Sequence, residues 1–484
     1  MASDKTSQGI SRRDFASRVG AAAGIVVGGH VLGARASAAP AVGQRIMGAN
    51  DRVVLASIGI RGQGNSLKRG FARLDGVEIK TLCDVDANLA PSRINDSQLA
   101  EVATFKPNFV QDMRRVLEDP DIDGVVIATP NHWHTLQTIW ALQSGKHVYV
   151  EKPSSHTVWE GRQMVESAAR NAGKMVQVGL MNRSRPAVQE AIAFVHGGGL
   201  GTVRVARGLC FKPRPSIGLY PDGPVQPGER YALTVTSNSY EPAWDAAYLA
   251  KVDYDLWTGP APKRPFNRNR FHYNWHWQWD YGNGDAGNQG PHQFDIARWG
   301  LQKREHPVKI QSAGGYFGPE SAQNTPNTLT SLFEYADGSV LEFATRGGFT
   351  NAEGDQRIGV LFYGDKGWLW IDESGRRWQS YFGPKNDPGP GTEAPGATPA
   401  AAGHPAPHPQ NFIDAIRAGD ASKLTCDALE GHLTSSLPHL GNIAYRVGRA
   451  LVFDGRTERF ASDPEADALL TREYRAGFEI PRQS

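Results

Sequence analysis

A lysine and a histidine far apart in the chain are the residues best suited to act together as acid and base. Lys152 lies near the end of the run HVYVEKP, residues 147–153, in which apolar residues give way to an acid, a lysine and a proline. Such a run is typical of a buried parallel strand, and ligands of open α/β sheets bind at the carboxyl ends of the strands. His292 follows a glycine-rich stretch, 282–290, and opens a helical pattern. Taken by itself, the run 147–153 is better explained as a strand followed by a charged turn than as part of a ligand site.

A glycine turn near the start of the chain predicts a dinucleotide site. The β-branched run 53–58 leads into GIRGQG, residues 59–64, and then into a helical pattern. The glycines allow a tight turn and close approach of a pyrophosphate to helix N–H groups, although the spacing is GxxGxG and not GxGxxG. A second strand, 77–82, precedes Asp84, which is either a turn residue or an acceptor for ribose hydroxyls that repels a 2′-phosphate. We therefore expect NAD, with NADP less favoured.

Strands and helices alternate as far as about residue 180. Further strands are expected at 123–130, 147–150 and 175–178, and helices at 132–143, capped by Asn131, and 159–171. This alternation predicts a doubly wound parallel sheet, a Rossmann domain over 48–180. His132 and His134 are an HxH pair without a nearby third ligand, so we expect no metal site.

Beyond residue 180 the alternation of strands and helices gives way to patterns typical of antiparallel strands and to many aromatic residues. This change predicts a substrate-binding α+β domain, 181–484, with an open, largely antiparallel sheet. A hairpin is expected at 328–345, a surface loop at 383–409, and helices at 411–416 and 428–447 that pack back on the Rossmann domain.

The composition narrows the class of partner. The 484 residues include 52 basic and 50 acidic ones, so neither nucleic acid nor an anionic membrane surface would be attracted by net charge. Three scattered cysteines favour neither a disulfide framework nor a thiolate metal site. We therefore expect partners that are small or neutral.

The amino terminus has the pattern of an export signal. Arg12 and Arg13 precede a weakly apolar run, 19–32, and then Ala36 to Ala38, a small-residue cleavage site. This resembles a twin-arginine signal peptide, residues 1–38, although an ordinary secretory signal is the alternative. Neither this run nor any later stretch is apolar enough for a membrane span. We expect export to the periplasm or beyond the cell, with a tightly held cofactor.

The stretch 272–281 alternates aromatic and polar residues, HYNWHWQWDY. An extended strand would place all the aromatic side chains on one face. The stretch is then either the wall of a sugar cleft, since sugars stack on aromatic rings, or an aromatic core layer with a solvated outer face.

Several motifs occur together in this chain: the glycine turn, CDVD, the ATP strand with Asn131 and His134, EKP, and GPH followed by FDIARW. With this combination the sequence resembles the Gfo/Idh/MocA oxidoreductases over about residues 51–449. The resemblance implies a homo-oligomeric NAD(P)-dependent sugar dehydrogenase, with Lys152 and His292 as catalytic residues. The family's aspartate four residues before that histidine is Asn288 here, and an amide cannot take up a proton. The cofactor is expected to contact Gly59, Arg61, Gly62, Gln63, Gly64, Asp84, Thr129, Pro130, Asn131, His134, Glu151 and Lys152. The substrate is expected to contact Arg183, Trp275, Tyr281, Asn288 and His292.

Three functions remain open at this point. The first is hydride transfer between the nicotinamide and a sugar, cyclitol or glycoside hydroxyl, with a bound cofactor that is recycled. The second is an NAD-dependent glycoside hydrolase that acts by oxidation, elimination and reduction, which the change to Asn288 favours. The third is a non-catalytic sugar-binding protein on the same fold.

Overall fold

The computed structural model describes residues 52–103, 106–224, 244–348, 351–392 and 407–482. The predicted export signal lies outside these residues. Six parallel strands form one sheet in the order β3-β2-β1-β4-β5-β6, in which every residue of β1, β4 and β6 is buried. The apolar runs therefore form strands that are covered on both faces, and this includes the edge strand β6. The strands are β1 (Val53–Ile58), β2 (Val77–Cys83), β3 (Asn108–Val110), β4 (Gly124–Ile127), β5 (His147–Val150) and β6 (Val176–Val178).

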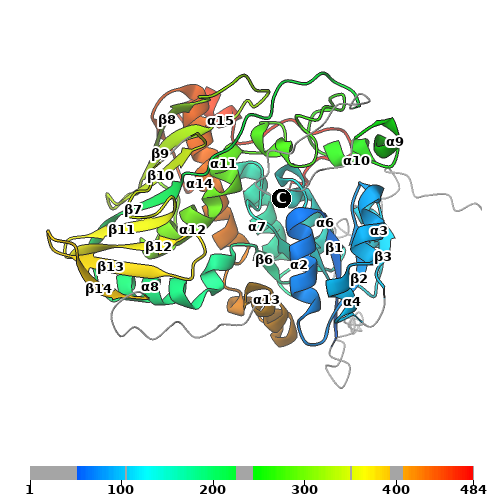
Figure 1. Ribbon diagram of the computed structural model, residues 1–484, viewed down its shortest axis with the longest axis horizontal. Helices are drawn as coiled ribbons and strands as arrows, with labels where there is room; N and C mark the ends of the chain where they lie inside the picture. The colour runs from blue at the N-terminus through cyan, green and yellow to red at the C-terminus, as the bar shows by residue number, and fades with distance from the viewer. Residues whose placement is uncertain (1–51, 104–105, 225–243, 349–350, 393–406, 483–484) are drawn as a thin grey trace, which may run out of the picture.

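Helices flank this sheet, and the helix α13 from the far end of the chain packs against it (Figure 1). Phe412 of α13 contacts Phe71 of α2 edge to face, with ring centroids 6.1 Å apart. Asn131 does not cap α6 as expected, because it is the first helical residue and its side chain donates to Asn283 Oδ1. The helices of this part are α2 (Gly62–Ala72), α3 (Ala90–Ile94), α4 (Ser97–Ala100), α5 (Met113–Leu117), α6 (Asn131–Gln143), α7 (Val158–Arg170) and α13 (Pro407–Ala418).

A second sheet of nine strands runs in the order β14-β13-β12-β11-β7-β10-β9-β8-β15. Only β7 and β10 pair in parallel within it, and β9 with β10 is the expected hairpin. β14 lies inside the stretch expected to be a loop, as a largely exposed edge strand. The strands are β7 (Val203–Cys210), β8 (Lys309–Gly315), β9 (Thr328–Glu334), β10 (Val340–Arg346), β11 (Ile358–Gly364), β12 (Gly367–Asp372), β13 (Trp378–Phe382), β14 (Asp387–Gly391) and β15 (Leu451–Val452).

The helices α12 and α14 stand between the two sheets (Figure 1). Phe294 of α12 packs on Phe343 of β10 with ring centroids 4.4 Å apart, while α14 contacts both β8 and α7. The predicted α/β Rossmann fold with a second, mostly antiparallel sheet is confirmed. Among the described residues, no helix is long and apolar enough to cross a bilayer. The remaining helices are α8 (Pro186–His196), α9 (Ala246–Leu249), α10 (Tyr254–Thr258), α11 (Gly284–Asn288), α12 (Gly290–Gly300), α14 (Ala428–Val447) and α15 (Pro464–Ala468).

Candidate active site

The glycine turn lies where β1 meets α2, and its geometry requires glycine at two positions. A Cβ on Gly59, at φ +80°, would lie 2.7 Å from the carbonyl carbon of Ala128, and a Cβ on Gly64 would lie 1.7 Å from Gly59 O. Gly62, in contrast, faces open space at the first turn of α2. The side chain before the helix does not cap it, so its first N–H groups can receive a phosphate. The residues present therefore fit a dinucleotide.

Asp84 fastens the end of β2 to this turn. Its carboxylate accepts hydrogen bonds from the backbone N–H groups of Ile60, at 2.9 Å, and Asp86, at 3.0 Å. Burial raises the pKa of Asp84 to about 6, although the two N–H donors oppose the shift. Asp84 also lines the cavity described below, so the same carboxylate is placed to meet a ribose.

Lys152 follows β5, and its ammonium group reaches across to α11. Nζ donates to the carbonyl oxygen of Asn288 at 2.6 Å. Burial lowers the pKa of Lys152, while the neighbouring Glu151 opposes that shift. Glu151 is itself buried, accepts a hydrogen bond from Gln63 Nε2 at 3.0 Å, and has a pKa raised by burial. The lysine is therefore held between the glycine turn and the second domain.

His134 holds the loops after β4 and β5 together. Its Nδ1 lies 2.6 Å from Pro153 O and its Nε2 lies 2.7 Å from Thr129 O. Burial lowers the pKa of His134 to about 4. Since Pro153 directly follows Lys152, this histidine fixes the backbone that carries the lysine.

His292 lies in the first turn of α12 and has no hydrogen-bond partner for its buried Nδ1 among the described residues. Burial lowers the pKa of His292 to about 3, and the positive charge of Lys152 adds to the effect. The imidazole is therefore neutral at pH 7. A neutral ring with an unsatisfied nitrogen can accept a proton from a bound hydroxyl.

One cavity of about 650 Å³ joins these groups. This volume is in the range of small-molecule sites in proteins. The cavity brings the glycine turn, Asp84, Lys152 and His292 together from two domains. The expected site residues that line it are Gly59, Arg61, Gly62, Gln63, Asp84, Thr129, Pro130, Asn131, His134, Glu151, Lys152, Trp275, Asn288 and His292.

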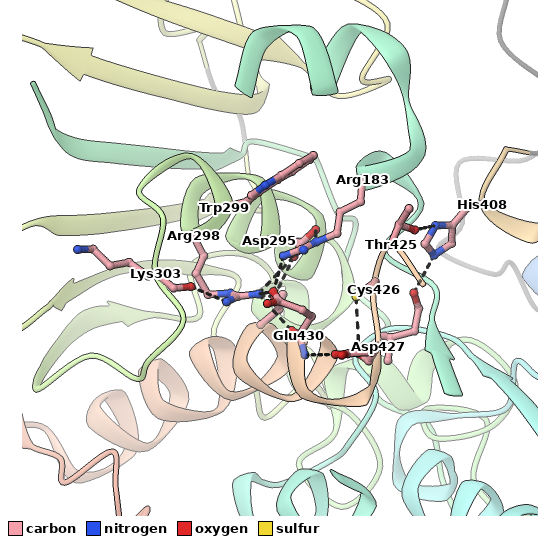
Figure 2. A network of polar contacts seen from close by, with 12 residues as sticks. Arg183, Asp295, Arg298, Trp299, Lys303, His408, Thr425, Cys426, Asp427 and Glu430 are labelled. Carbon is pink, nitrogen blue, oxygen red and sulfur yellow. Dashed lines mark hydrogen bonds and ion pairs between the residues drawn. The ribbon is translucent and has the colours of Figure 1, made fainter. Parts of the chain in front are cut away.

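Arg183, expected to contact substrate, lies elsewhere (Figure 2). Its Nε donates to both carboxylate oxygens of Asp295, at 2.8 and 2.9 Å, and its guanidinium donates to Glu430 at 2.8 Å. Burial would lower the pKa of Arg183, but the charge of Asp295 raises it above its usual value. The side chain is 9% exposed and does not line the cavity. It joins α12 to α14, so its place is structural.

The aromatic stretch 272–281 is not the expected strand. Residues Asn274–Trp277 form a 3-10 turn, and His272 has a φ of +53°, so side chains do not alternate between two faces. Trp275 stacks on His276, with centroids 3.5 Å apart, and both line the cavity. Tyr281 is fully buried, 4.8 Å from the Trp257 ring, and does not line it. The stretch is therefore partly core and partly cavity wall.

Sequence reasoning missed several cavity residues. Arg185 and Arg376 line the cavity but belong to segments without a recognisable motif, and His276, which lies within the aromatic stretch, lines it as well. His272 also lines it, and its Nε2 donates a hydrogen bond to the carboxylate of Asp86 at 2.9 Å. Polar residues beside the aromatic stretch were the one available signal for the two histidines.

A cluster of three residues outside the cavity consists of types that commonly bind metal ions. The ligand atoms of His306, His432 and Glu458 lie within 4.8 Å of one another. Both histidines, at 2.8 and 2.7 Å, and Arg162, at 2.5 Å, share Oε1 of Glu458. Because a cation already pairs with this carboxylate, the geometry is that of a buried hydrogen-bond network that ties the segment after α14 to α7.

The fold and the cavity define a class of two-domain proteins in which a dinucleotide-binding Rossmann domain meets a sheet-containing domain that supplies a histidine. Residues 57–180 match the model described as oxidoreductase family, NAD-binding Rossmann fold. Residues 244–351 and 392–480 match the oxidoreductase family's C-terminal alpha/beta domain. The chain therefore belongs to the Gfo/Idh/MocA oxidoreductase family and has an NAD-binding domain.

Individual relatives agree with this assignment. A glycosyl hydrolase family 109 protein of Shewanella baltica is 34% identical over 187 residues, 36% of this chain and 40% of that protein. The match thus spans about two fifths of such a relative. The aldose-aldose oxidoreductase of Caulobacter crescentus, solved with glycerol, is 17% identical with a TM-score of 0.59 over 83% of this chain and 100% of that one. Levoglucosan dehydrogenase, solved with NADH and levoglucosan, is 19% identical with a TM-score of 0.59 over 83% and 99%. These two similarities to solved structures show that the fold is shared.

Proposed function

We propose that this protein transfers hydride between NAD and a carbon that bears a hydroxyl group in a sugar, cyclitol or glycoside. The observation that carries the proposal is the neutral His292 and the desolvated Lys152 in one cavity with the glycine turn. The solved relatives bound to glycerol or levoglucosan support a polyol substrate.

Each side chain then has a distinct task. When bound, the nicotinamide accepts the hydride. His292 takes the hydroxyl proton, because its ring is neutral and its Nδ1 has no competing partner among the described residues. Lys152 donates a hydrogen bond to the same oxygen and stabilises the negative charge that develops on it. Asn288 orients a neighbouring hydroxyl through its amide, which also lies 3.4 Å from Tyr273 Oη.

A second function has its own support. The identity with a glycosyl hydrolase family 109 protein favours oxidation of a glycoside, elimination of the aglycone, addition of water to the unsaturated ketone and reduction of the resulting product, with no net redox change. The amide at Asn288 fits this reading, since it cannot assist His292 by taking up a proton.

The test is to purify the protein without added nucleotide, release bound nucleotide by denaturation, and supply free sugars and aryl glycosides. NADH formation with free sugars supports the dehydrogenase. Aglycone release without net NADH supports the hydrolase, and absence of both nucleotide and turnover refutes both. His292→Ala should lower kcat about 100-fold or more, with Arg204→Gln as a surface control.

We also propose that residues 1–38 direct export by the twin-arginine route, that NAD is carried inside the folded protein, and that the protein forms a homo-oligomer. Because free NAD is scarce outside the cytoplasm, a retained cofactor would be reoxidised by a second sugar. A fusion of residues 1–38 to a reporter, with Arg12 and Arg13 changed to lysine as control, tests the export.

A further inference from the structure

Arg185 and Arg376 line the cavity, and the chemistry proposed above gives them no role. Arg185 directly precedes α8, and Arg376 lies in the turn between β12 and β13. The turn packs closely against α8 and the residues just before it. A Cβ atom on Gly375, at φ +61°, would lie only 3.0 Å from Val188 Cγ2 and 3.2 Å from Asn182 Oδ1. The two arginines therefore belong to segments in direct contact.

The guanidinium group of Arg185 is not neutralised. Its Nε is buried without a hydrogen-bond partner, and its side chain forms no ion pair within the described part of the chain. Burial lowers the pKa of Arg185 and the charge of Arg376 adds to that effect, while the charge of Asp372, which forms no ion pair with Arg185, opposes it. Arg214, by comparison, pairs with Asp285 at 2.7 Å. A buried N–H group without a partner is costly unless a ligand satisfies it.

The acids near these arginines have other partners. Asp372 Oδ1 accepts from the backbone N–H of Arg376 at 3.0 Å, and its Oδ2 accepts from Ser374 Oγ at 2.7 Å. Arg377 also lies against Asp372, with Nε 3.4 Å from Oδ2. Glu373 lines the cavity but lies 3.8 Å from Lys212 Nζ. The cavity wall between the arginines and Lys152 therefore has an excess of positive charge.

We propose that the substrate carries an anionic group, a carboxylate or a phosphate monoester, that Arg185 and Arg376 bind while a hydroxyl of the same molecule faces His292 and Lys152. This inference rests on the proposed function. The planar guanidinium group matches both anions by paired N–H donors, so the two share one recognition chemistry. The substrate class is then a sugar acid or a sugar phosphate.

Binding tests the inference without turnover. The NAD-loaded, full-length protein is titrated with glucuronate, glucose 6-phosphate and glucose, and the thermal midpoint and calorimetric affinity are recorded. One anionic ligand should bind at least about 10-fold more tightly than glucose, and Arg185→Gln should remove about 10- to 100-fold of that affinity. Arg376→Gln should have a smaller effect because its side chain is exposed. Arg204→Gln, a surface charge on β7, is the matched control.

The outcomes separate the two proposals. Preference for glucuronate or for the phosphate, lost in Arg185→Gln, supports the inference and tells the two anions apart. Equal affinity for all three ligands, unchanged in Arg185→Gln, overturns it. If neutral sugars are turned over in that case, the proposed dehydrogenase function still stands. Anion binding without any nucleotide-dependent turnover refutes the proposed dehydrogenase function instead. For a substrate that does turn over, Arg185→Gln should raise KM and leave kcat within about threefold, since it binds a group remote from the reacting carbon.

Discussion

Substituting Asn288 by aspartate should raise the pH at which His292 and Lys152 titrate. Asn288 ends α11 and His292 lies in the first turn of α12, with helical backbone angles at Gln289 of φ −92° and ψ −38°. Residues four apart on a helical backbone have neighbouring side chains. Lys152 Nζ already donates to Asn288 O at 2.6 Å. A carboxylate at position 288 would therefore lie near both groups.

The size of the effect follows from the present state of His292. Burial and the charge of Lys152 hold the pKa of His292 at about 3. An opposite charge within about 4–6 Å favours the protonated form by about 1–3 pKa units. The variant histidine should then titrate between about pH 4 and pH 6, and the lowered pKa of Lys152 should move back up.

The assay is the pH dependence of kcat/KM from pH 4 to pH 10. Loss of activity on the acid side should be absent or only beginning in the wild-type protein and should appear between about pH 4 and pH 6 in Asn288→Asp. Asn288→Leu removes the amide without adding charge and is the control. If the acid limbs of Asn288→Asp and Asn288→Leu coincide, His292 is not the group that loses activity on protonation.

Two further predictions concern stability. Arg183→Leu should lower the free energy of unfolding by about 3 kcal/mol in a denaturant titration, because it removes the nearest cation from the buried Asp295 and leaves, among the described residues, only Arg298, 3.9 Å away; a rise in KM at unchanged stability would return Arg183 to a substrate role. Acid should destabilise the protein through His432 and Glu458. Burial lowers the pKa of His432 to about 4, whereas the same histidine in the unfolded chain has a pKa of about 6.5. Between these two values the unfolded chain binds a proton that the folded protein does not bind, which lowers the free energy of unfolding by up to about 3 kcal/mol by pH 4. Burial would raise the pKa of Glu458, but hydrogen bonds from His306, His432 and Arg162 lower it, so its contribution is also lost as pH falls. His432→Asn should reduce the drop in thermal midpoint between pH 7.5 and pH 5, and an identical drop in both proteins would contradict this account.

Local patterns were enough to predict where the residues of the Rossmann half lie in the fold. The run 53–58 is β1, and the glycine turn follows it with the close approaches that only glycine permits at Gly59 and Gly64. The carboxyl ends of parallel strands meet at one edge, so Asp84 and Lys152 were expected there from their places after β2 and β5. The apolar runs with their glycines, and the rule that parallel strands end at one edge of the sheet, were sufficient to place these residues.

The same reasoning failed where a residue's role depends on distant partners. Arg183 follows β6, as a ligand-binding residue would, but it pairs with Asp295, 112 residues away, and Glu430, 247 residues away. The aromatic stretch has the period of a strand, yet His272 takes a left-handed conformation beside Asp86, 186 residues distant. In both places long-range contacts overrode the local pattern.

The substrate end of the cavity shows why specificity is harder to predict than chemistry. Arg185 and Arg376 are 191 positions apart by number and become neighbours only because the turn at Gly375 packs on α8. Nothing in either local sequence distinguishes them from Arg183 or Arg377, which pair with acids. What distinguishes Arg185 is the absence of a carboxylate partner in the described structure, a property of the whole fold. On the function proposed above, the Rossmann half holds the cofactor for hydride transfer, and the charges of Arg185 before α8 and of Arg376 between β12 and β13 select the molecule that supplies or receives the hydride.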